Sequence, residues 1–260
     1  MNNPYNSGLE RNPANFQPLT PLTFLERAAS VYPEHTAIIH GKLKRSYSDF
    51  YSRSLRLASA LSSQGIKRGD TVSAILSNTP AMLEAHYGVP MCGAVLHSIN
   101  TRLDPDTIAY QLDHSDAKAL IVDREFLDAV KISLELSEVS PILIDYNDSE
   151  YPVLDSLPEA IEYEAFLLQG DTNYEWLMPE DEWDAISLNY TSGTTGNPKG
   201  VVSHHRGAYL LAQGNAMIAS IKKHSVYLWT LPMFHCNGWC FPWTMSAIIG
   251  THVCLRHVRA

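Results

Sequence analysis

A regular alternation of short apolar segments with capped helical segments, between residues 71 and 144, constrains the fold most strongly. The apolar segments predict strands at residues 71–76, 94–99, 118–122 and 142–144. The helices expected between them span residues 80–91, 105–114 and 125–136. Thr79-Pro80 and Asp104-Pro105 each place a capping side chain before a proline, a common way for a helix to begin. Strands that alternate with helices over short connections form a parallel sheet with helices on both faces, so the sequence predicts an α/β fold.

The amino-terminal flank adds an arm, two helices and a hairpin to this pattern. Residues 1–19 are polar and are expected to form an arm, and Thr20-Pro21 begins a helix with Thr20 as its N-cap. A glycine turn then joins two strands at residues 36–40 and 43–47. The next helix is expected to begin at Ser48 and to end at Gly65, because glycine commonly follows a helix.

The carboxyl-terminal flank begins with an acidic, irregular stretch over residues 145–182, which contains one helix around residues 159–168. A strand at residues 183–189 leads into a glycine-rich loop, and the chain resumes at Val201-Val202. The remaining elements are expected at residues 204–221 (helix), 226–230 (strand), 239–249 (helix) and 252–255 (strand).

Composition excludes several classes of function. The net charge of -9 argues against nucleic acid and anionic membranes as partners. The chain has no apolar run of the roughly 18 residues that a membrane span needs. Residues 1–19 have no apolar core and are not a secretory signal. The four cysteines form no Cys-x-x-Cys pair, which favours a reducing intracellular compartment such as the cytoplasm or the peroxisome. The sequence gives no indication of an oligomeric state.

The segment Tyr190–Gly200, Tyr-Thr-Ser-Gly-Thr-Thr-Gly-Asn-Pro-Lys-Gly, has the composition of a phosphate-binding loop. Its glycines allow close approach of backbone N–H groups to an oxyanion, its hydroxyls add donors, and Lys199 adds a positive charge. It is not the common P-loop, because Lys199 is not preceded by glycine or followed by serine or threonine. The alternative is a flexible linker, which seldom lies between two apolar strands.

A second segment, Leu231–Trp239, follows a predicted strand and precedes a predicted helix. Loops at the carboxyl ends of parallel strands are where α/β folds bind ligands. Trp229, Trp239 and Trp243 crowd this region and would suit the walls of an acyl or aromatic pocket. The alternative for His235 is a buried imidazole that has only a packing role.

Two further groups of residues permit more than one interpretation. Cysteines and histidines near the carboxyl end are weak candidates for a zinc site, since their spacing lacks the paired ligands of structural zinc. These residues are His235, Cys236, Cys240, His252 and His257. His204-His205-Arg206 begins the helix after the loop, where it could help to hold phosphate or form an ordinary solvated first turn.

The loop and the second segment together resemble the two signatures of the adenylate-forming, acyl-activating enzymes, which include acyl-CoA synthetases and aryl-CoA ligases. The resemblance implies the large amino-terminal domain of that fold, with residues 20–260 as part of its AMP-binding domain. It assigns the β- and γ-phosphates of ATP to Thr191, Ser192, Gly193, Thr194, Thr195, Gly196 and Lys199. It places His235, Asn237, Gly238 and Trp239 at the acyl pocket, with His235 in a gating or positioning role and Lys199 in a catalytic one. Thr194 or Thr195 is the candidate contact for a Mg²⁺ ion that arrives with ATP; no metal-ligand set is expected.

The implied reaction joins a carboxylic acid to coenzyme A. The carboxylate attacks the α-phosphorus of ATP, pyrophosphate leaves, and a thiol then displaces AMP from the acyl-adenylate. A carboxylic acid with a pKa near ~4 is already ionised at neutral pH, so the first step needs no base. Segments such as Asn100–Asp104 and His114–Lys118 resemble the plant-type enzymes that include benzoate– and medium-chain fatty acid–CoA ligases.

The chain lacks the later motifs of that family, including the segment that holds adenine, the acid that binds ribose, and the carboxyl-terminal lid domain with its catalytic lysine. We therefore expect the 260-residue chain alone to have little or no ligase activity. Two alternatives remain open. One is a non-catalytic relic or interaction protein, and the other is an adenylating enzyme that loads the thiol of a carrier protein.

Overall fold

A seven-stranded sheet forms the larger half of the computed structural model, which describes residues 3, 5, 7–191 and 197–257. The strand order is β7-β6-β5-β3-β4-β8-β9, and every neighbouring pair is parallel except β8 and β9. The strands are β3 (Thr71–Ile75), β4 (Val95–Ser98), β5 (Ala117–Asp123), β6 (Ile142–Tyr146), β7 (Ile161–Glu162), β8 (Ala185–Tyr190) and β9 (Gly200–His204). The predicted parallel sheet is confirmed.

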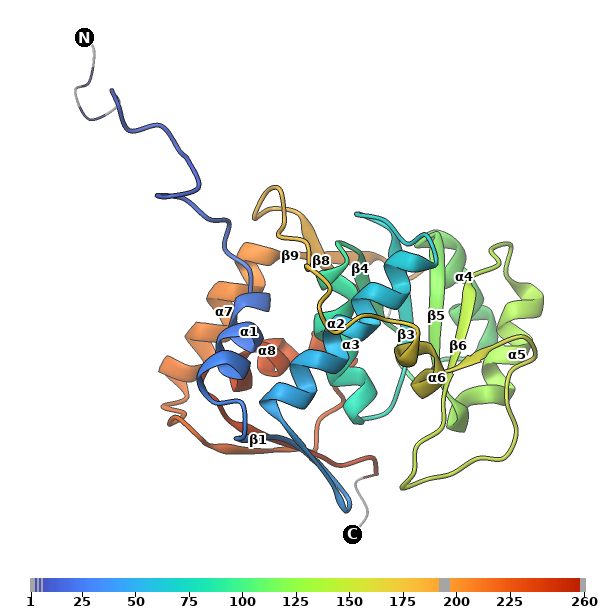
Figure 1. Ribbon diagram of the computed structural model, residues 1–260. Helices are drawn as coiled ribbons and strands as arrows, with labels where there is room; N and C mark the ends of the chain where they lie inside the picture. Colours follow the sequence, from blue (N-terminus) through green and yellow to red (C-terminus); the bar gives the residue numbers. More distant parts are fainter. Residues whose placement is uncertain (1–2, 4, 6, 192–196, 258–260) are drawn as a thin grey trace.

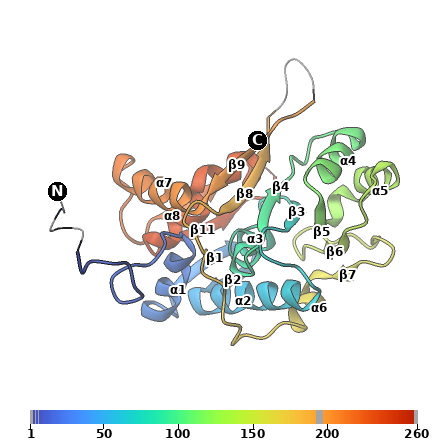
Figure 2. The same ribbon diagram turned by 90° about the horizontal axis from the view of Figure 1, so that it is seen from above.

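Helices cover both faces of this sheet (Figure 2). One face packs against α2 (Tyr47–Ser63), α3 (Pro80–Met91) and α6 (Tyr163–Leu168), and the other against α4 (Pro105–His114), α5 (Leu127–Leu136) and a short 3-10 helix, η2 (Arg124–Phe126). Strand β5 shows why both faces are covered. Ala119 and Ile121 belong to the apolar cluster of α2 and α3, whereas Leu120 and Val122 belong to the cluster of α4 and α5. Successive side chains of a strand point to opposite faces, so a wholly apolar strand needs a helix on each side.

A separate four-stranded sheet, which the sequence did not predict, has the order β10-β11-β1-β2. Its strands are β10 (Val226–Trp229), β11 (Thr251–Cys254), β1 (Thr36–His40) and β2 (Leu43–Ser46). Each was expected as a strand, but β11 pairs in parallel with β1, more than 200 residues away, instead of joining the first sheet. The helices on this side of the molecule are α1 (Leu22–Val31), α7 (His205–Ile218) and α8 (Phe241–Ala247), with a short 3-10 segment, η3 (His235–Cys240), before α8 (Figure 1).

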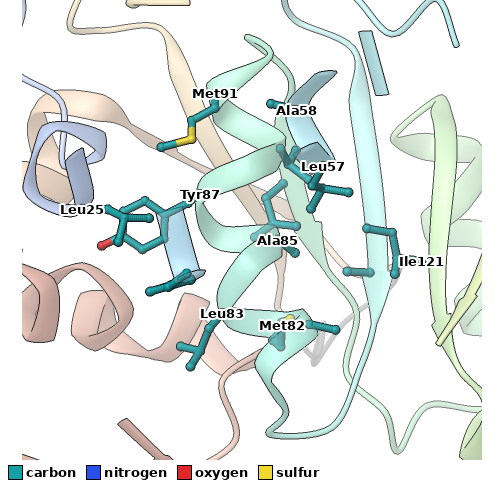
Figure 3. Close-up of a cluster of buried hydrophobic side chains, with 14 of the residues drawn as sticks. Leu25, Leu57, Ala58, Met82, Leu83, Ala85, Tyr87, Met91 and Ile121 are labelled. Carbon is teal, nitrogen blue, oxygen red and sulfur yellow. The ribbon is translucent and has the colours of Figure 1, made fainter. Parts of the chain in front are cut away.

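Helix α3 lies at the centre of the molecule, and all twelve of its residues are buried. In Figure 3, Tyr87 extends toward Leu25 of α1, and Met82 lies on the opposite side of the helix, toward Ile121 of β5. Pro90 lacks the N–H that would bond the carbonyl of His86, and the indole N–H of Trp243 donates to that carbonyl instead, at 3.2 Å. A helix that is apolar on every side is expected to be buried on every side.

One charged residue, Glu84, is fully buried in α3 and is held by two arginines. Arg53 Nε donates to Glu84 Oε1 at 2.7 Å, Arg45 pairs with the same oxygen, and the hydroxyl of Tyr163 donates to Oε2 at 2.8 Å. Burial alone would raise the pKa of Glu84, but the two arginines outweigh it and hold the pKa below its usual value. The carboxylate therefore stays ionised and ties α3 to β2, α2 and α6.

Several predicted boundaries are corrected by local capping. The helix expected from Ser48 begins at Tyr47, because the hydroxyl of Ser46 accepts from Asp49 N and Asp49 in turn accepts from Ser46 N. Gly65 follows the end of that helix with a φ of 90°, as expected. The helix expected over residues 159–168 begins only at Tyr163, after strand β7.

The amino-terminal segment and the membrane question complete the description. Residues 7–17 are exposed and extend away from the body of the molecule (Figure 1). Thr20, by contrast, is buried, and its hydroxyl lies 2.9 Å from Nδ1 of His205. No helix within residues 7–191 and 197–257 is long and apolar enough to cross a membrane.

Candidate active site

The base of the Tyr190–Gly200 loop is the turn between β8 and β9, which run antiparallel and project from the sheet (Figure 2). Thr191 N donates to Lys199 O at 3.0 Å, which closes the two arms of the loop. The side chain of Lys199 is exposed. Ser192, Gly193, Thr194, Thr195 and Gly196 lie outside the described residues, so their phosphate-binding roles stay predictions.

Helix α4 holds both arms of this loop from the side. The hydroxyl of Tyr190 lies 2.7 Å from Nδ1 of His114, and the hydroxyl of Tyr110 donates to the carbonyl of Pro198 at 3.3 Å. Partial burial raises the pKa of Tyr190 to about 12, so the phenol keeps its proton at neutral pH. The loop therefore starts and ends on a fixed frame, as a phosphate grip that relies on positioning requires.

Beneath the loop, the ring of His97 stacks at a tilt against Tyr190, with centroids 5.0 Å apart. Ser73 Oγ lies 2.9 Å from Nδ1 of His97, and Gln111 Oε1 lies 3.3 Å from Nε2. Burial lowers the pKa of His97 to about 4. A neutral imidazole that accepts from Ser73 and donates to Gln111 satisfies all three side chains, so His97 supports the loop without carrying charge.

The second segment is attached to the seven-stranded sheet by three asparagine side chains. Asn78, just after β3, donates to the carbonyls of Trp229 and Leu231 and accepts from Met233 N, over 2.8–3.0 Å. Asn237 Nδ2 donates to Ser98 Oγ at 2.9 Å, at the end of β4. Asn189 Nδ2, at the end of β8, donates to the carbonyl of Phe234 at 3.1 Å. None of these attachments was predicted, because an asparagine shows its partner only in the folded chain.

Asn189 brings the two predicted motifs together. It immediately precedes Tyr190, where the first loop begins, and its partner Phe234 immediately precedes His235. The structure thus places the start of the glycine-rich loop directly beside the start of the His235 segment. Neighbouring strand ends are the expected position for two parts of one site.

Residues 236–240 form a left-handed turn with φ between 42° and 62°. Such a conformation costs roughly 1–2 kcal/mol for each residue other than glycine. The turn corrects the helix expected from Trp239, since α8 begins only at Phe241, one residue before Pro242. Gly238 packs tightly, because a Cβ there would lie 3.0 Å from the ring of Trp229. Strain of this kind persists only where surrounding contacts hold it, and it is frequent at functional sites.

The proposed acyl-pocket residues differ in exposure. His235 is exposed and Trp239 is half exposed, whereas Asn237 and Gly238 are buried. Trp229 and Trp243 are buried in the core and do not form the walls of an open pocket. The aromatic wall expected from three tryptophans is therefore corrected to one exposed ring, that of Trp239.

A cleft of about 400 Å³ opens beside this segment. Its walls come from the residues that follow the carboxyl ends of five strands. Ser77 and Asn78 follow β3, Thr101 and Arg102 follow β4, Glu125 and Phe126 follow β5, Thr230 and Pro232 follow β10, and Leu255 and Arg256 follow β11. Carboxyl ends of parallel strands are the usual ligand-binding edge of α/β sheets. Phe234 also lines the cleft, whereas His235, Asn237, Gly238 and Trp239 do not.

Arg256 joins the two sheets at the floor of this cleft. Its guanidinium donates to Asp123, at the end of β5, and to Asp148, beyond β6, each at 2.6 Å. It also donates to Glu125 at 2.9 Å. Burial raises the pKa of Asp123 despite this partner. The sequence gave no sign of the network, since its members lie more than 100 residues apart.

Residues 204–206 do not contribute to the phosphate site, and this corrects one of the two interpretations. Strand β9 carries the chain back along β8, so His204 pairs with Ala185 at the far end of that strand. His205 is buried beside Thr20, and burial lowers its pKa to about 4. Arg206 forms an ion pair with Glu182 at 2.6 Å. The solvated first turn is also incorrect for His205.

The zinc interpretation finds no geometric support within residues 7–191 and 197–257, where no group of three suitable side chains converges. His252 Nδ1 accepts from the indole N–H of Trp229 at 3.0 Å, and burial lowers its pKa to about 3. Burial also raises the pKa of Cys240 to about 12, which disfavours the thiolate that zinc requires. Cys236 is exposed, and all four cysteines are free.

The comparisons identify the class of protein that this fold and site define. The family model described as "AMP-binding enzyme" matches residues 25–260, so the chain belongs to that family. The fold is also similar to a crystal structure of an anthranilate CoA ligase in complex with anthranoyl-AMP, with a TM-score of 0.83 at 21% identity. That match covers 96% of this chain and 47% of the other.

Named relatives narrow the likeness to plant acyl-activating enzymes. The chain is 50% identical to a peroxisomal acetate/butyrate–CoA ligase of Arabidopsis thaliana and 48% identical to an acetate–CoA ligase of Humulus lupulus. Each match covers 97% of this chain and 46% of the relative. A peroxisomal benzoate–CoA ligase of Arabidopsis thaliana is 46% identical, with 95% and 44% covered. The chain thus spans slightly less than half the length of these relatives.

Proposed function

We propose that this chain supplies the phosphate-gripping and acyl-facing part of a carboxylic acid–thiol ligase, which makes acyl-CoA from an acid, ATP and coenzyme A. The observation that carries the proposal is the hydrogen bond of Asn189 to Phe234, which joins the glycine-rich loop to the His235 segment. Family membership and the acyl-CoA ligase names of the relatives support the same reaction.

In the first step, the substrate carboxylate attacks the α-phosphorus of ATP and the bond to the β-phosphate oxygen breaks, which releases pyrophosphate. Lys199 and the hydroxyls of Thr191, Ser192, Thr194 and Thr195 would neutralise and hold the departing phosphates. Mg²⁺ belongs to the nucleotide substrate in this proposal, because it usually keeps phosphate and water oxygens as ligands. Thr194 or Thr195 is its candidate protein contact.

In the second step, the thiol of coenzyme A attacks the acyl carbonyl and AMP leaves. We assign His235 a gating or positioning role here, because it is exposed at the start of the turn that Asn78, Asn189 and Asn237 fix. A fixed base with one exposed side chain suits a residue that changes position between steps. Asn237, Gly238 and Trp239 complete the proposed acyl side of the site.

The test measures nucleotide binding, since the chain spans 46% of the relatives' length and turnover would need what the other half supplies. Isothermal titration calorimetry should detect binding of ATP with Mg²⁺ to the chain. Lys199→Ala should weaken that binding about 10- to 100-fold, as expected for the loss of a charged hydrogen bond. Lys67→Ala, which removes an equally exposed lysine before β3, is the matched control and should bind normally.

Two results would contradict the proposal. A folded chain that binds no ATP with Mg²⁺ would remove the nucleotide site. Equal binding by the Lys199 and Lys67 variants would show that the glycine-rich loop is not the phosphate grip.

We also propose a boundary and a compartment. Residues 1–19 are an arm, and residues 20–260 belong to the AMP-binding domain; the change from exposed residues 7–17 to buried Thr20 supports this division. The peroxisomal names of several relatives support an intracellular, peroxisomal location over a cytoplasmic one. Fluorescence microscopy of a fusion to the complete coding sequence would test the location, and secretion would contradict it.

A further inference from the structure

Helix α7 carries apolar side chains on its outer face as well as on the face that packs inward. His205, Ala208 and Ala212 point inward and are buried. The opposite face carries the α7 stripe, which we define as Leu210, Leu211, Gly214, Met217 and Ile218. At 100° per residue, these five positions fall on one side of the helix. Figure 1 shows α7 at the outer left of the molecule, with α1 and α8 on its inner side.

The α7 stripe is too exposed for an ordinary surface helix. Met217 is 79% exposed and Ile218 90%, and Leu210 and Leu211 are close to half exposed. A Cβ added to Gly214 would meet no atom within 4 Å, so the middle of the stripe is open. A helix that is apolar on both sides is normally covered on both sides. The stripe therefore has the character of an interface.

The strands on either side of α7 in the chain are both open edges. Within the described residues, β9 pairs only with β8 and β10 pairs only with β11. Val201 and Val202 of β9 and Val226 and Leu228 of β10 are 50–67% exposed. Exposed apolar edges invite the addition of a strand. An edge strand, an apolar helix and a second edge strand thus follow one another between residues 200 and 229.

The lengths of the relatives indicate what covers this surface. The matched segment accounts for 97% of this chain but only 46% of the two most similar enzymes described above, so more than half of each relative lies outside it. That remainder must bury apolar surface against the matched half if the two form one folded domain. A strand added in parallel to β10 would also need a crossover helix, and the α7 stripe is an apolar surface that such a helix could cover.

We propose that the α7 stripe and the free edge of β10 form a docking surface for the second half of the acyl-activating fold, which contributes a helix against the stripe and a parallel strand beside β10. The occupant is a polypeptide with the sequence character of the relatives beyond the matched segment. The proposal concerns assembly, so it stands or falls independently of nucleotide binding.

Co-expression tests this directly. The tagged chain is co-expressed with the part of the Humulus lupulus acetate–CoA ligase that follows the matched segment, and the native first half of that enzyme provides the reference yield. We expect a one-to-one complex on affinity purification and size-exclusion chromatography. The double variant Leu211→Glu/Ile218→Glu should reduce its yield roughly tenfold or more, because two charges would be buried without partners.

The matched control is Ile132→Glu/Leu136→Glu on α5, which changes two apolar residues that are about half exposed on the other side of the molecule. It should leave the complex intact. Gly214→Arg provides a second disruption that adds no internal clash, and circular dichroism of each purified chain confirms its fold.

Three outcomes would overturn the proposal. The first is a folded chain that forms no complex, and the second is equal complex yield from the stripe and control variants. The third is a homodimer of the chain that the stripe variant abolishes, which would assign the surface to a second copy instead.

Discussion

Helices α3 and α7 have similar lengths, and both carry apolar residues around most of their circumference, yet they occupy opposite environments. All residues of α3 are buried between the two sheets, as Figure 3 shows for its central part. Helix α7 buries one face and leaves the α7 stripe in solvent. Composition is thus a record of what a helix is built to contact, and only the fold shows whether that contact is present.

The glycines of the two helices make the same comparison at a single atom. A Cβ at Gly88 of α3 would lie 2.8 Å from side-chain atoms of Leu57, so α2 and α3 approach closely at that point. A Cβ at Gly214 of α7 would meet nothing. The first glycine permits packing that exists within the chain, whereas the second leaves a gap on an unoccupied surface.

The largest expected effect comes from the charged residue in the buried helix. Glu84→Ala should lower the free energy of unfolding by about 3–5 kcal/mol, because Arg45 and Arg53 would lose their buried partner. Urea denaturation would measure it. The control is Glu164→Ala, which also removes a partner of Arg53 but from a half-exposed side chain, and should cost at most ~1 kcal/mol. Equal losses in the two variants would contradict the buried-charge explanation.

Acid should destabilise both helices through one buried histidine in each. Burial lowers the pKa of His86 in α3 and of His205 in α7 to about 4, against ~6.5 in the unfolded chain. Above pH 6.5 neither costs stability. As the pH falls toward 4, the unfolded chain takes up these protons first, and each histidine lowers the unfolding free energy by about 1.4 kcal/mol per pH unit.

Urea denaturation between pH 4.5 and 7.5 would measure this dependence in the wild type and in His205→Gln. The variant should show a smaller slope by about one proton over that range. An unchanged slope would indicate that His205 is protonated in the folded chain.

Gly88→Ala should destabilise the chain by about 1–3 kcal/mol, even though alanine is a better helix former than glycine. The added methyl group would collide with Leu57, and α2 and α3 would have to separate. Thermal unfolding followed by circular dichroism is sufficient to detect it. A rise in melting temperature would show that the contact between the two helices is loose.

The smallest expected effect has the opposite sign. Gly214→Ala should stabilise the chain by about 0.5–1 kcal/mol, because it improves helix propensity in an open position. The same denaturation experiment measures it, with Gly88→Ala as the matched change in the buried helix. A loss of stability would mean that the outer face of α7 is already covered.

Much of the local structure was predictable because its causes lie within a few residues. The strand at 36–40 was predicted with its observed bounds, and Asp104 caps α4 through Thr107 N as its proline-containing sequence indicates. The cap of α2 was predicted two residues late, because Ser46 and Ser48 both suit an N-cap and only the reciprocal bond with Asp49 distinguishes them. The turn at 236–240 was not predictable, since its left-handed conformation depends on Asn237 meeting Ser98 and on Asn215 donating to the carbonyl of Trp239.

By itself, the sequence determined the alternation of strands and helices, the parallel sheet and the two motif segments, because periodicity, capping and glycine placement act over short distances. Only the tertiary structure decided that the strands divide into two sheets, that β9 carries His204 away from the loop, and that Asn78, Asn189 and Asn237 hold the His235 segment. It also decided that α3 is enclosed while α7 is not. These outcomes depend on which distant segments meet, and an apolar or amide side chain has the same identity whether or not its partner is there.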